Sequence, residues 1–323
     1  MSKVVFVTGI SGFLASHIVQ QLVEQGHCVI GTSRSKKLVA LRELYKNYPS
    51  VEVIEAGDLA TARLEEPLKR AEILIHTASP LPGHGDFETM LKTSTQGTLN
   101  ILEQAKKAGI KKIVVTSSMT AALGDPRQEG TTIKNDYWNA ITKDKATPAS
   151  GTTTLPAYMY AKTHTEKALW EWARENPHVA VTTINPTFFY GPFPNLSLPA
   201  APGDFGGLST NLMMYNFLYT KGVYTPSPGY TDVREVAHAH LGAAFRQSSA
   251  GKRVLVTSPH PFAIQPLLDI LKEKRPSVIR GRLNTQPVPQ FKFGKFTIDY
   301  ESLEEATGLK LSEFHTLEEV LWN

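Results

Sequence analysis

The feature that most constrains this chain is a regular alternation of short β-branched runs with longer helical patterns over residues 1–185. Short apolar runs alternating with amphipathic stretches predict parallel strands joined by crossover helices. We therefore expect an α/β fold built on a doubly wound parallel sheet, with helices on both faces. The expected strands are Val4–Thr8, Cys28–Thr32, Val51–Glu55, Ile73–Thr77, Lys112–Ser117 and Val179–Ile184. The expected helices run through Leu14–Leu22, which Gly26 ends, and through Leu38–Tyr45, Phe87–Lys107 and Tyr158–Arg174.

The rhythm changes near residue 186, where proline and glycine become frequent. This composition predicts a smaller, loop-rich C-terminal part, which we expect to shape a substrate site. Residues 1–185 are the expected nucleotide-binding domain, and residues 186–323 are mainly the expected substrate-binding region. A helical pattern at Val233–Gln247 and a strand-like run at Val254–Thr257 are expected to return to the sheet, which places residues 230–258 with the first domain. A last helix is expected at Thr316–Trp322.

Composition excludes several classes of function. Lys plus Arg number 34 against 30 Asp plus Glu, and a formal charge of +4 is too mild to predict a nucleic-acid partner. The single cysteine, Cys28, excludes an internal disulfide framework and a cysteine-based zinc site. His238 and His240 are too close in sequence to share a helix face, so we expect no metal. No stretch matches a signal sequence or a membrane span, and a reducing cytoplasm is the expected compartment.

A glycine turn, Thr8-Gly9-Ile10-Ser11-Gly12-Phe13-Leu14-Ala15, follows the first expected strand and opens the first helix. In a dinucleotide-binding Rossmann fold the first glycine makes a tight turn, and the second lets the backbone approach a pyrophosphate. The small Ala15 allows close packing of helix and strand, and the helix N terminus offers N–H donors to phosphate. An ordinary tight turn is the alternative. The position between strand and helix favours cofactor contacts by Gly9, Ile10, Gly12, Phe13 and Leu14.

The end of the second expected strand indicates which nicotinamide cofactor is bound. An NAD site usually places Asp or Glu there for the ribose 2′-hydroxyl, whereas a nearby arginine suits a 2′-phosphate. Here the strand runs into Ser33-Arg34-Ser35-Lys36-Lys37, with no acidic residue before Glu43. The planar guanidinium of Arg34 suits a phosphate group. We therefore expect NADP, with a merely solvated basic loop as the alternative.

Two further strand ends face the edge of the sheet where open α/β sheets bind ligands. Asp58 and Leu59 follow the third expected strand and would reach the adenine ring, although a loop cap explains Asp58 equally well. Thr77, Ala78 and Ser79 follow the fourth strand and would flank the nicotinamide half of the cofactor.

The most informative constellation is Ser118, after the fifth expected strand, together with Tyr158 and Lys162. The four-residue spacing places the phenol and the ammonium group on one helix face. A tyrosine with its usual pKa of about 10 is a poor acid–base group at neutral pH, and we expect the cation to lower that pKa. Ser118 would hold a substrate oxygen. The alternative, a surface tyrosine with an incidental lysine, does not account for all three residues and the glycine turn.

These residues resemble the extended short-chain dehydrogenase/reductase family, most closely its dihydroflavonol-reductase and fungal aldehyde/ketone-reductase branch. The resemblance covers nearly the whole chain. It rests on Thr8–Ala15, Asp58-Leu59, His76–Pro80, Thr116–Ser118, Tyr158–Lys162, Asn185-Pro186 and Tyr230–Val233. It implies NADPH, a catalytic set at Ser118, Tyr158 and Lys162, cofactor contacts by Lys37 and Pro186 besides those above, and reduction of a carbonyl. One departure is Gln96 before Gly97, where many members carry Asn, so a proton relay there is not implied.

The leading hypothesis is therefore an NADPH-dependent carbonyl reductase with a small-molecule substrate. A sugar-nucleotide epimerase or dehydratase of the same family is one alternative, against which Arg34 and the apolar, proline-rich segment 186–229 argue. A non-enzymatic NADP-sensing protein is the other, against which the intact catalytic set argues. Oligomeric state is not indicated. We expect a mainly apolar pocket that favours hydrophobic or aromatic carbonyls or ketoesters, with Trp138 as either a pocket lip or a surface anchor. Its expected wall includes Pro80, Leu81, Met119, Trp138, Phe188 and Tyr190.

Overall fold

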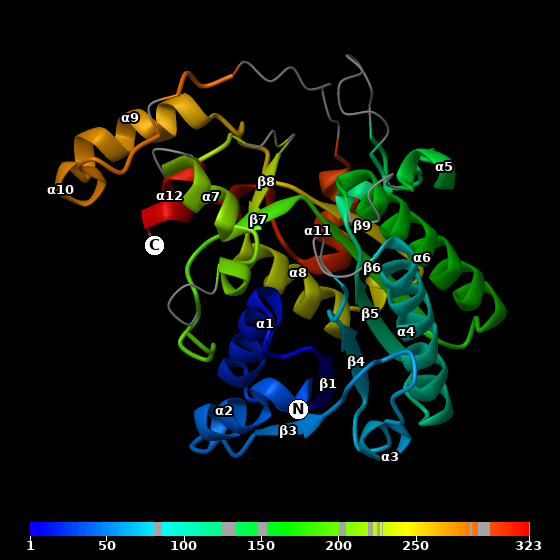
Figure 1. The fold of residues 1–323 in the computed structure, drawn as a ribbon. Helices are drawn as coiled ribbons and strands as arrows, with labels where there is room; N and C mark the ends of the chain where they lie inside the picture. The colour runs from blue at the N-terminus through cyan, green and yellow to red at the C-terminus, as the bar shows by residue number, and fades with distance from the viewer. Residues whose placement is uncertain are drawn as a thin grey trace.

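A seven-stranded parallel sheet lies at the centre of the molecule (Figure 1). Its strands, in spatial order, are β3 (Val51–Glu55), β2 (Cys28–Ser33), β1 (Val4–Thr8), β4 (Ile73–His76), β5 (Lys112–Thr116), β6 (Ala180–Pro186) and β9 (Arg253–Val256). The strand order reverses between β1 and β4, which is where doubly wound sheets bind ligands. The computed structural model describes residues 1–80, 86–123, 133–147, 154–199, 205–218, 222–224, 227, 229–284, 286–289 and 298–322.

Helices cover both faces of this sheet (Figure 1). One face carries α1 (Phe13–Glu24), α2 (Ser35–Tyr45), α8 (Val233–Phe245) and α11 (Tyr300–Thr307), and the other carries α3 (Glu65–Leu68), α4 (Phe87–Lys107) and α6 (Leu155–Glu175). Successive strand residues separate into the two cores: Val5 and Val7 pack with α1 and α8, whereas Phe6 packs with α4. This separation follows from the two-residue period of a strand. The sheet and its two helix layers confirm the predicted fold class.

All six strands predicted over residues 1–185 are present: β1 and β3 have the predicted bounds, and the other four have ends displaced by one or two residues. Because β4 ends at His76 and β5 at Thr116, Thr77, Ser117 and Ser118 lie in the loops that follow. Helix α4 has the predicted bounds, whereas α6 begins before Tyr158, at Leu155. It starts there because the Thr154 side chain accepts from Ala157 N–H and a proline lies in the first turn.

Residues 233–256, which form α8 and β9, return to the main sheet. β9 pairs in parallel with β6, and α8 packs against α1. Helix α8 ends at Phe245, short of the predicted Gln247, because Gln247–Ser249 form a 3₁₀ turn. The strand and helix expected to return do so. The division of the chain into two domains near residue 185 stays a prediction.

A second, two-stranded parallel sheet was not predicted. It pairs β7 (Phe188–Tyr190) with β8 (Tyr230–Asp232), and runs of three residues carry too little pattern to be recognised. A third apolar core, which includes Tyr190, Phe217 and Tyr230, joins this sheet to the C-terminal helices. Those helices are α7 (Asn211–Leu218), α9 (Ile264–Lys274) and α12 (Leu317–Trp322). Two short helices complete the described elements: α10 (Pro276–Ile279) follows α9, and α5 (Lys143–Ala146) precedes α6.

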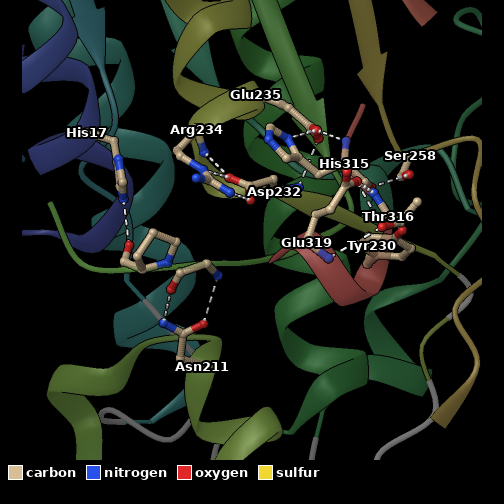
Figure 2. Close-up of polar contacts among 12 residues, drawn as sticks. His17, Asn211, Tyr230, Asp232, Arg234, Glu235, Ser258, His315, Thr316 and Glu319 are labelled. Carbon is tan, nitrogen blue, oxygen red and sulfur yellow. Dashed lines mark hydrogen bonds and ion pairs between the residues drawn. The ribbon is translucent and has the colours of Figure 1, made fainter. Parts of the chain in front are cut away.

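Polar contacts around β8 tie α8 to the C-terminal segment (Figure 2). Asp232 caps α8 by accepting from Arg234 N–H at 2.7 Å, and Glu235 accepts from Asp232 N–H at 3.0 Å to complete a capping box. Glu235 Oε1 also lies 2.9 Å from His315 Nδ1, and burial raises the pKa of Glu235 to about 6. Tyr230 donates its hydroxyl hydrogen to the His315 carbonyl at 3.1 Å. These contacts hold the approach to α12 against the second sheet.

Within the part of the chain that the structure describes, no helix has the length and apolar character needed to cross a bilayer. The same residues include no group of three or more His, Cys, Asp or Glu side chains arranged to hold a metal ion.

Candidate active site

The glycine turn between β1 and α1 adopts the geometry that requires glycine at its first position. Gly9 has a φ of +71°, and a Cβ there would stand 3.1 Å from Ala78 Cβ. Its N–H donates to Thr32 Oγ1 at 3.0 Å, which ties the turn to β2. A Cβ at Gly12 would stand 3.2 Å from the Gly9 carbonyl oxygen. Side chains are therefore excluded from both glycines, and backbone groups line the turn.

A cavity of about 160 Å³ opens at the N terminus of α1. Ser11, Gly12 and Phe13 line it from the turn, and Lys37 lines it from α2. Gly12 is the N-cap residue of α1 and offers no side chain to the first N–H groups of the helix. These N–H groups, the helix dipole and the Lys37 ammonium group together fit a bound phosphate.

The two cations expected at a 2′-phosphate are placed differently. Arg34 and Lys37 are both exposed, and Arg34 is the N-cap residue of α2. Lys37 lines the cavity, whereas Arg34 does not. Lys36, between them, is also exposed and lies outside the cavity lining. Of the two expected cations, only Lys37 therefore shares a cavity with the phosphate-binding turn.

The far wall of the cavity comes from the C-terminal part of the chain, at Phe193 and Ser197. This segment is attached to the nucleotide-binding side by hydrogen bonds from both of its neighbouring helices, α1 and α2. His17 Nε2 lies 2.9 Å from the Pro192 carbonyl oxygen (Figure 2), and the Tyr45 hydroxyl donates to the Leu196 carbonyl at 2.9 Å. The ring of Phe13 also packs against that of Phe193, with centroids 4.8 Å apart. Segment 192–199 therefore closes one side of the phosphate cavity, whereas the sequence predicted for residues 186–323 only a role at the substrate.

A buried hydrogen-bond network holds the loop after β4. Thr8 Oγ1 accepts from the N–H groups of Thr77 and Ala78, both at 3.1 Å, and lies 2.8 Å from His76 Nδ1. Two accepted bonds leave the hydroxyl hydrogen for Nδ1, so His76 carries its proton on Nε2, which faces Thr98 Oγ1 at 3.2 Å. Burial, aided by the Lys162 charge, lowers the pKa of His76 to about 3. A neutral His76 thus positions Thr77 and Ala78, with Ser79 next in the loop.

The loop after β3 contains Asp58 and Leu59. Asp58 is exposed, and its Oδ1 accepts from Ala60 N–H at 2.9 Å, so the structure shows the loop cap. Leu59 packs over Gly97, where a Cβ would stand 3.4 Å from Leu59 Cβ. Adenine contacts by Asp58 and Leu59 stay predictions. Gln96, the residue that departs from the family pattern, is exposed on α4.

Ser118, Tyr158 and Lys162 meet at the carboxyl end of β5. Ser118 is buried and begins a 3₁₀ turn, Met119–Ala121, where its side-chain oxygen accepts from Thr120 Oγ1 at 2.9 Å. The Tyr158 phenol lies within hydrogen-bonding reach of Ser118, and Lys162 Nζ lies 5.8 Å from the centre of the Tyr158 ring. Lys162 itself is buried. The three predicted residues are thus brought together.

The electrostatics of this group differ from the expectation in one respect. Burial raises the pKa of Tyr158 to about 12, although the hydrogen bond with Ser118 opposes this change. Burial also lowers the pKa of Lys162 to about 8, while the charge of Glu166 opposes it. The expected lowering of the Tyr158 pKa is therefore not found in the protein alone, because the effect of burial outweighs that of the hydrogen bond with Ser118.

The residues expected to line a substrate pocket differ in how deeply the structure buries them. Phe188 and Pro80 are half-buried near strand ends, and Pro186 ends β6. Tyr190 is fully buried in the third core, so its placement in the wall is wrong. Trp138 stacks on the Arg253 guanidinium, whose carbon lies 4.0 Å from the ring centre, which fits the anchor alternative. The two side chains also line a cavity other than the one at the glycine turn, and a place for Trp138 at the substrate pocket stays a prediction. Met119 is buried in a small apolar cluster with Leu255, and Leu81 lies outside the described residues.

Sequence reasoning missed Glu166, a buried carboxylate one turn beyond Lys162 on α6. It forms an ion pair with Arg253 of β9, with Oε1 at 2.6 Å from Nε. The spacing Tyr158, Lys162, Glu166 repeats every four residues, which places all three on one helix face. That repeat was the available signal for Glu166, whereas Arg253 had none.

Comparisons with known proteins identify the family of this chain. The sequence profile of the NAD dependent epimerase/dehydratase family matches residues 5–215, and the chain belongs to that family. This confirms the resemblance to extended short-chain dehydrogenases/reductases.

Individual relatives are reductases. The chain is 30% identical over 300 residues to the NADPH-dependent methylglyoxal reductase GRE2 of Saccharomyces cerevisiae, covering 86% of this chain and 84% of that protein. It is 30% identical over 296 residues to the ketoreductase adrE of Penicillium rubens, covering 88% and 84%. The crystal structure of yeast methylglyoxal/isovaleraldehyde reductase Gre2 with NADPH matches with a TM-score of 0.84 at 27% identity, covering 98% and 96%.

Proposed function

We propose that this protein is an NADPH-dependent reductase that converts an aldehyde or ketone to the alcohol. The observation that carries the proposal is the meeting of Ser118, Tyr158 and Lys162 at the same edge of the sheet as the glycine turn. Parallel strands present their carboxyl ends at one edge, so a dinucleotide on the turn would extend toward these three side chains. The named activities of GRE2 and adrE support the same reaction class.

The residues of the phosphate end fit the cofactor. The side-chain-free turn at Gly9 and Gly12 and the cavity beside Lys37 accommodate a diphosphate and a 2′-phosphate. Ile10, Phe13 and Leu14 would contact the cofactor from the turn, with Arg34 supplying a second cation. Asp58, Leu59, Thr77, Ala78, Ser79 and Pro186 would line the remainder at the other strand ends. When bound, NADPH supplies a hydride to the carbonyl carbon.

The chemistry at the carbonyl oxygen falls to the protein. Ser118 and Tyr158 donate hydrogen bonds to that oxygen, and Tyr158 transfers its proton as the oxygen gains negative charge. The phenolate left behind is stabilised by the Lys162 ammonium group, which also binds ribose hydroxyls. With its pKa lowered to about 8 by burial, Lys162 still carries its charge at neutral pH. Proton donation by Tyr158 therefore depends on Lys162 being charged.

The substrate class follows from the walls of the site. Half-buried Phe188 and Pro80 offer apolar surface near the catalytic edge. A sugar nucleotide would need cations there for its diphosphate, but Lys37, the cation that lines the phosphate cavity, makes no described contact with Ser118. An apolar wall favours hydrophobic or aromatic carbonyls and ketoesters over the diphosphate of a sugar nucleotide.

A substrate panel tests the proposal. Purified protein is mixed with NADPH and, separately, with aliphatic aldehydes, aromatic aldehydes, ketones, ketoesters and UDP-sugars, and nicotinamide absorbance is followed. We expect oxidation of NADPH with several simple carbonyls. Turnover of a UDP-sugar without any simple carbonyl would instead support the epimerase alternative, and NADPH binding without turnover of any compound would support a sensor.

A further inference from the structure

Glu166 is a buried carboxylate with many hydrogen-bond donors around it. It is 2% exposed and receives hydrogen bonds from five different residues on four elements and loops. A buried carboxylate is retained only when its charge and lone pairs are satisfied. The question is what this arrangement does beside Tyr158 and Lys162.

The two oxygens of Glu166 face different partners. Oε2 accepts from Ser117 Oγ at 2.6 Å and from Asn185 Nδ2 at 2.8 Å. Oε1 accepts from Thr183 Oγ1 at 3.1 Å and from Trp170 Nε1 at 3.4 Å. Arg253 reaches both, with Nε 2.6 Å from Oε1 and Nη2 3.4 Å from Oε2.

The Oε2 side leads directly to Ser118. Ser117 precedes Ser118 in the chain, and Asn185 Nδ2 also donates to the Ser118 carbonyl at 3.2 Å. Both routes from Oε2 therefore end on the backbone that carries the Ser118 hydroxyl. The Thr183 and Trp170 side chains on the Oε1 side make no described contact with Ser117 or Ser118. Ile184, the residue after Thr183, accepts from Ser117 N–H at 2.8 Å, but this is a bond between backbone groups that a change of the Thr183 side chain leaves in place.

Arg253 is fixed independently of Glu166. Its Nη1 donates to the carbonyl oxygens of Asn135, at 3.0 Å, and Tyr137, and the Trp138 ring stacks on the guanidinium with its centre 4.0 Å away. Because these contacts hold Arg253 in place, its ion pair with Glu166 fixes the position of the Glu166 carboxylate.

We propose that Glu166 is a positioning residue, which holds Ser118 in register with Tyr158 and Lys162 through Ser117 and Asn185. The inference rests on the proposed function, because register matters only if Ser118 and Tyr158 share a substrate oxygen. The charge of Glu166 also favours the ammonium form of Lys162, its neighbour one turn earlier on α6.

A matched pair of variants tests this role. Ser117→Ala removes a bond on the Oε2 side, and Thr183→Val removes a similar bond on the Oε1 side without changing side-chain shape. We expect Ser117→Ala to lower kcat by about tenfold or more, because small displacements at a reacting centre are costly. We expect Thr183→Val to leave kcat within about twofold of wild type. The Tm of both variants should be lower than that of the wild type, because each variant loses a charge-assisted hydrogen bond.

Cofactor binding provides the second readout. The Kd for NADPH, measured by fluorescence titration, should stay close to the wild-type value in both variants, because neither side chain lies at the phosphate end. A loss of kcat confined to Ser117→Ala, with Kd unchanged, supports positioning. An equal loss of kcat in the two variants, or none in Ser117→Ala, overturns it and leaves Glu166 a purely structural group.

Glu166→Gln keeps the experiment decisive should Ser117→Ala fail to fold. An amide cannot accept from every donor on both sides, so we expect kcat to fall by at least about tenfold in protein that still binds NADPH. Folded Glu166→Gln with the wild-type kcat overturns the role. A wild-type protein that binds NADPH but reduces no carbonyl overturns the proposed function, and the positioning role with it.

Discussion

The phosphate end and the catalytic end of the candidate cofactor site are built in different ways. At the phosphate end the groups are backbone N–H donors of a glycine turn and the exposed cations Arg34 and Lys37. At the catalytic end Ser118, Lys162 and Glu166 are buried, and each makes hydrogen bonds or charge contacts to neighbouring buried groups. The phosphate end therefore offers backbone groups and solvent-exposed side chains, whereas the catalytic end uses side chains buried in the core.

This difference predicts two kinds of response to mutation. Exposed cations act through charge that salt screens, so changes there should alter cofactor affinity to a degree that depends on salt. Buried groups act together, so a change at the catalytic end should affect turnover strongly and stability as well.

The largest effect is expected from Lys162→Met, which removes a buried ammonium group while filling most of its volume. Turnover should fall by about 10²–10⁴-fold, the usual range for lost acid–base assistance, and NADPH should bind more weakly. Lys167→Met is the control, because Lys167 is exposed on the same helix and faces Trp138 instead. Steady-state kinetics and NADPH titration of both variants check this, and a fully active Lys162→Met protein would remove the lysine from the mechanism.

The next largest effect is expected from Gly9→Ala, which places a side chain in the turn. The φ of +71° strains any L-residue by about 1–2 kcal/mol, and the new Cβ would press on Ala78. Gly26→Ala is matched, because Gly26 has a φ of +76° with open space around it. Urea unfolding should show a loss of stability in both, whereas NADPH affinity should fall only in Gly9→Ala. Equal NADPH affinities would show that the turn does not contact the cofactor.

A smaller and more selective effect is expected from the two exposed cations. Charge-assisted hydrogen bonds contribute about 1.5–3 kcal/mol, so Arg34→Ala or Lys37→Ala should raise KM for NADPH roughly tenfold to hundredfold and that for NADH little. Because Lys37 lines the cavity, its removal should cost at least as much as that of Arg34. Lys36→Ala, which removes the same charge outside the cavity, is the control. Equal use of NADH and NADPH by the wild type would show that neither cation meets a 2′-phosphate.

The smallest effect concerns acid stability at the catalytic end, where two histidines are buried. Burial lowers the pKa of His76 to about 3 and that of His240, which contacts Thr116 just before Ser117, to about 4. Below pH 6.5 these histidines are protonated in the unfolded chain but stay neutral in the folded protein. The stability that they contribute at pH 7 is therefore lost as the pH falls. Each histidine should cost about 1.4 kcal/mol per pH unit. Urea unfolding of His240→Gln should therefore show about 2 kcal/mol less loss between pH 6.5 and 5 than wild type, and an unchanged slope would contradict this.

How much the sequence could predict also differs between the two ends. The glycine turn, the bounds of α4 and the spacing of Tyr158 and Lys162 are local patterns, so the fold class and the principal candidate residues follow from periodicity and spacing. Arg34 and Lys37 could be found in the same way, but which of them borders the cavity at the turn could not, because that depends on how α2 packs beside α1.

The contacts that were missed are long-range. Glu166 and Arg253 are 87 residues apart, and only the pairing of β6 with β9 brings them together. Tyr190 follows the catalytic strands closely enough to suggest a pocket wall, yet its three-residue strand pairs with β8 and turns the ring into the third core. Tertiary packing therefore decided the cases in which local pattern was ambiguous.

The central claim is that Tyr158 gives its proton to a carbonyl oxygen beside bound NADPH. Tyr158→Phe tests it most directly, because the substitution removes the hydroxyl and keeps the ring. The measurement is kcat for carbonyl reduction alongside the Kd for NADPH in the wild type and the variant. The account predicts that kcat falls by about 10²–10⁴-fold while Kd changes by no more than about twofold. A Tyr158→Phe protein that binds NADPH normally and keeps the wild-type kcat would contradict it.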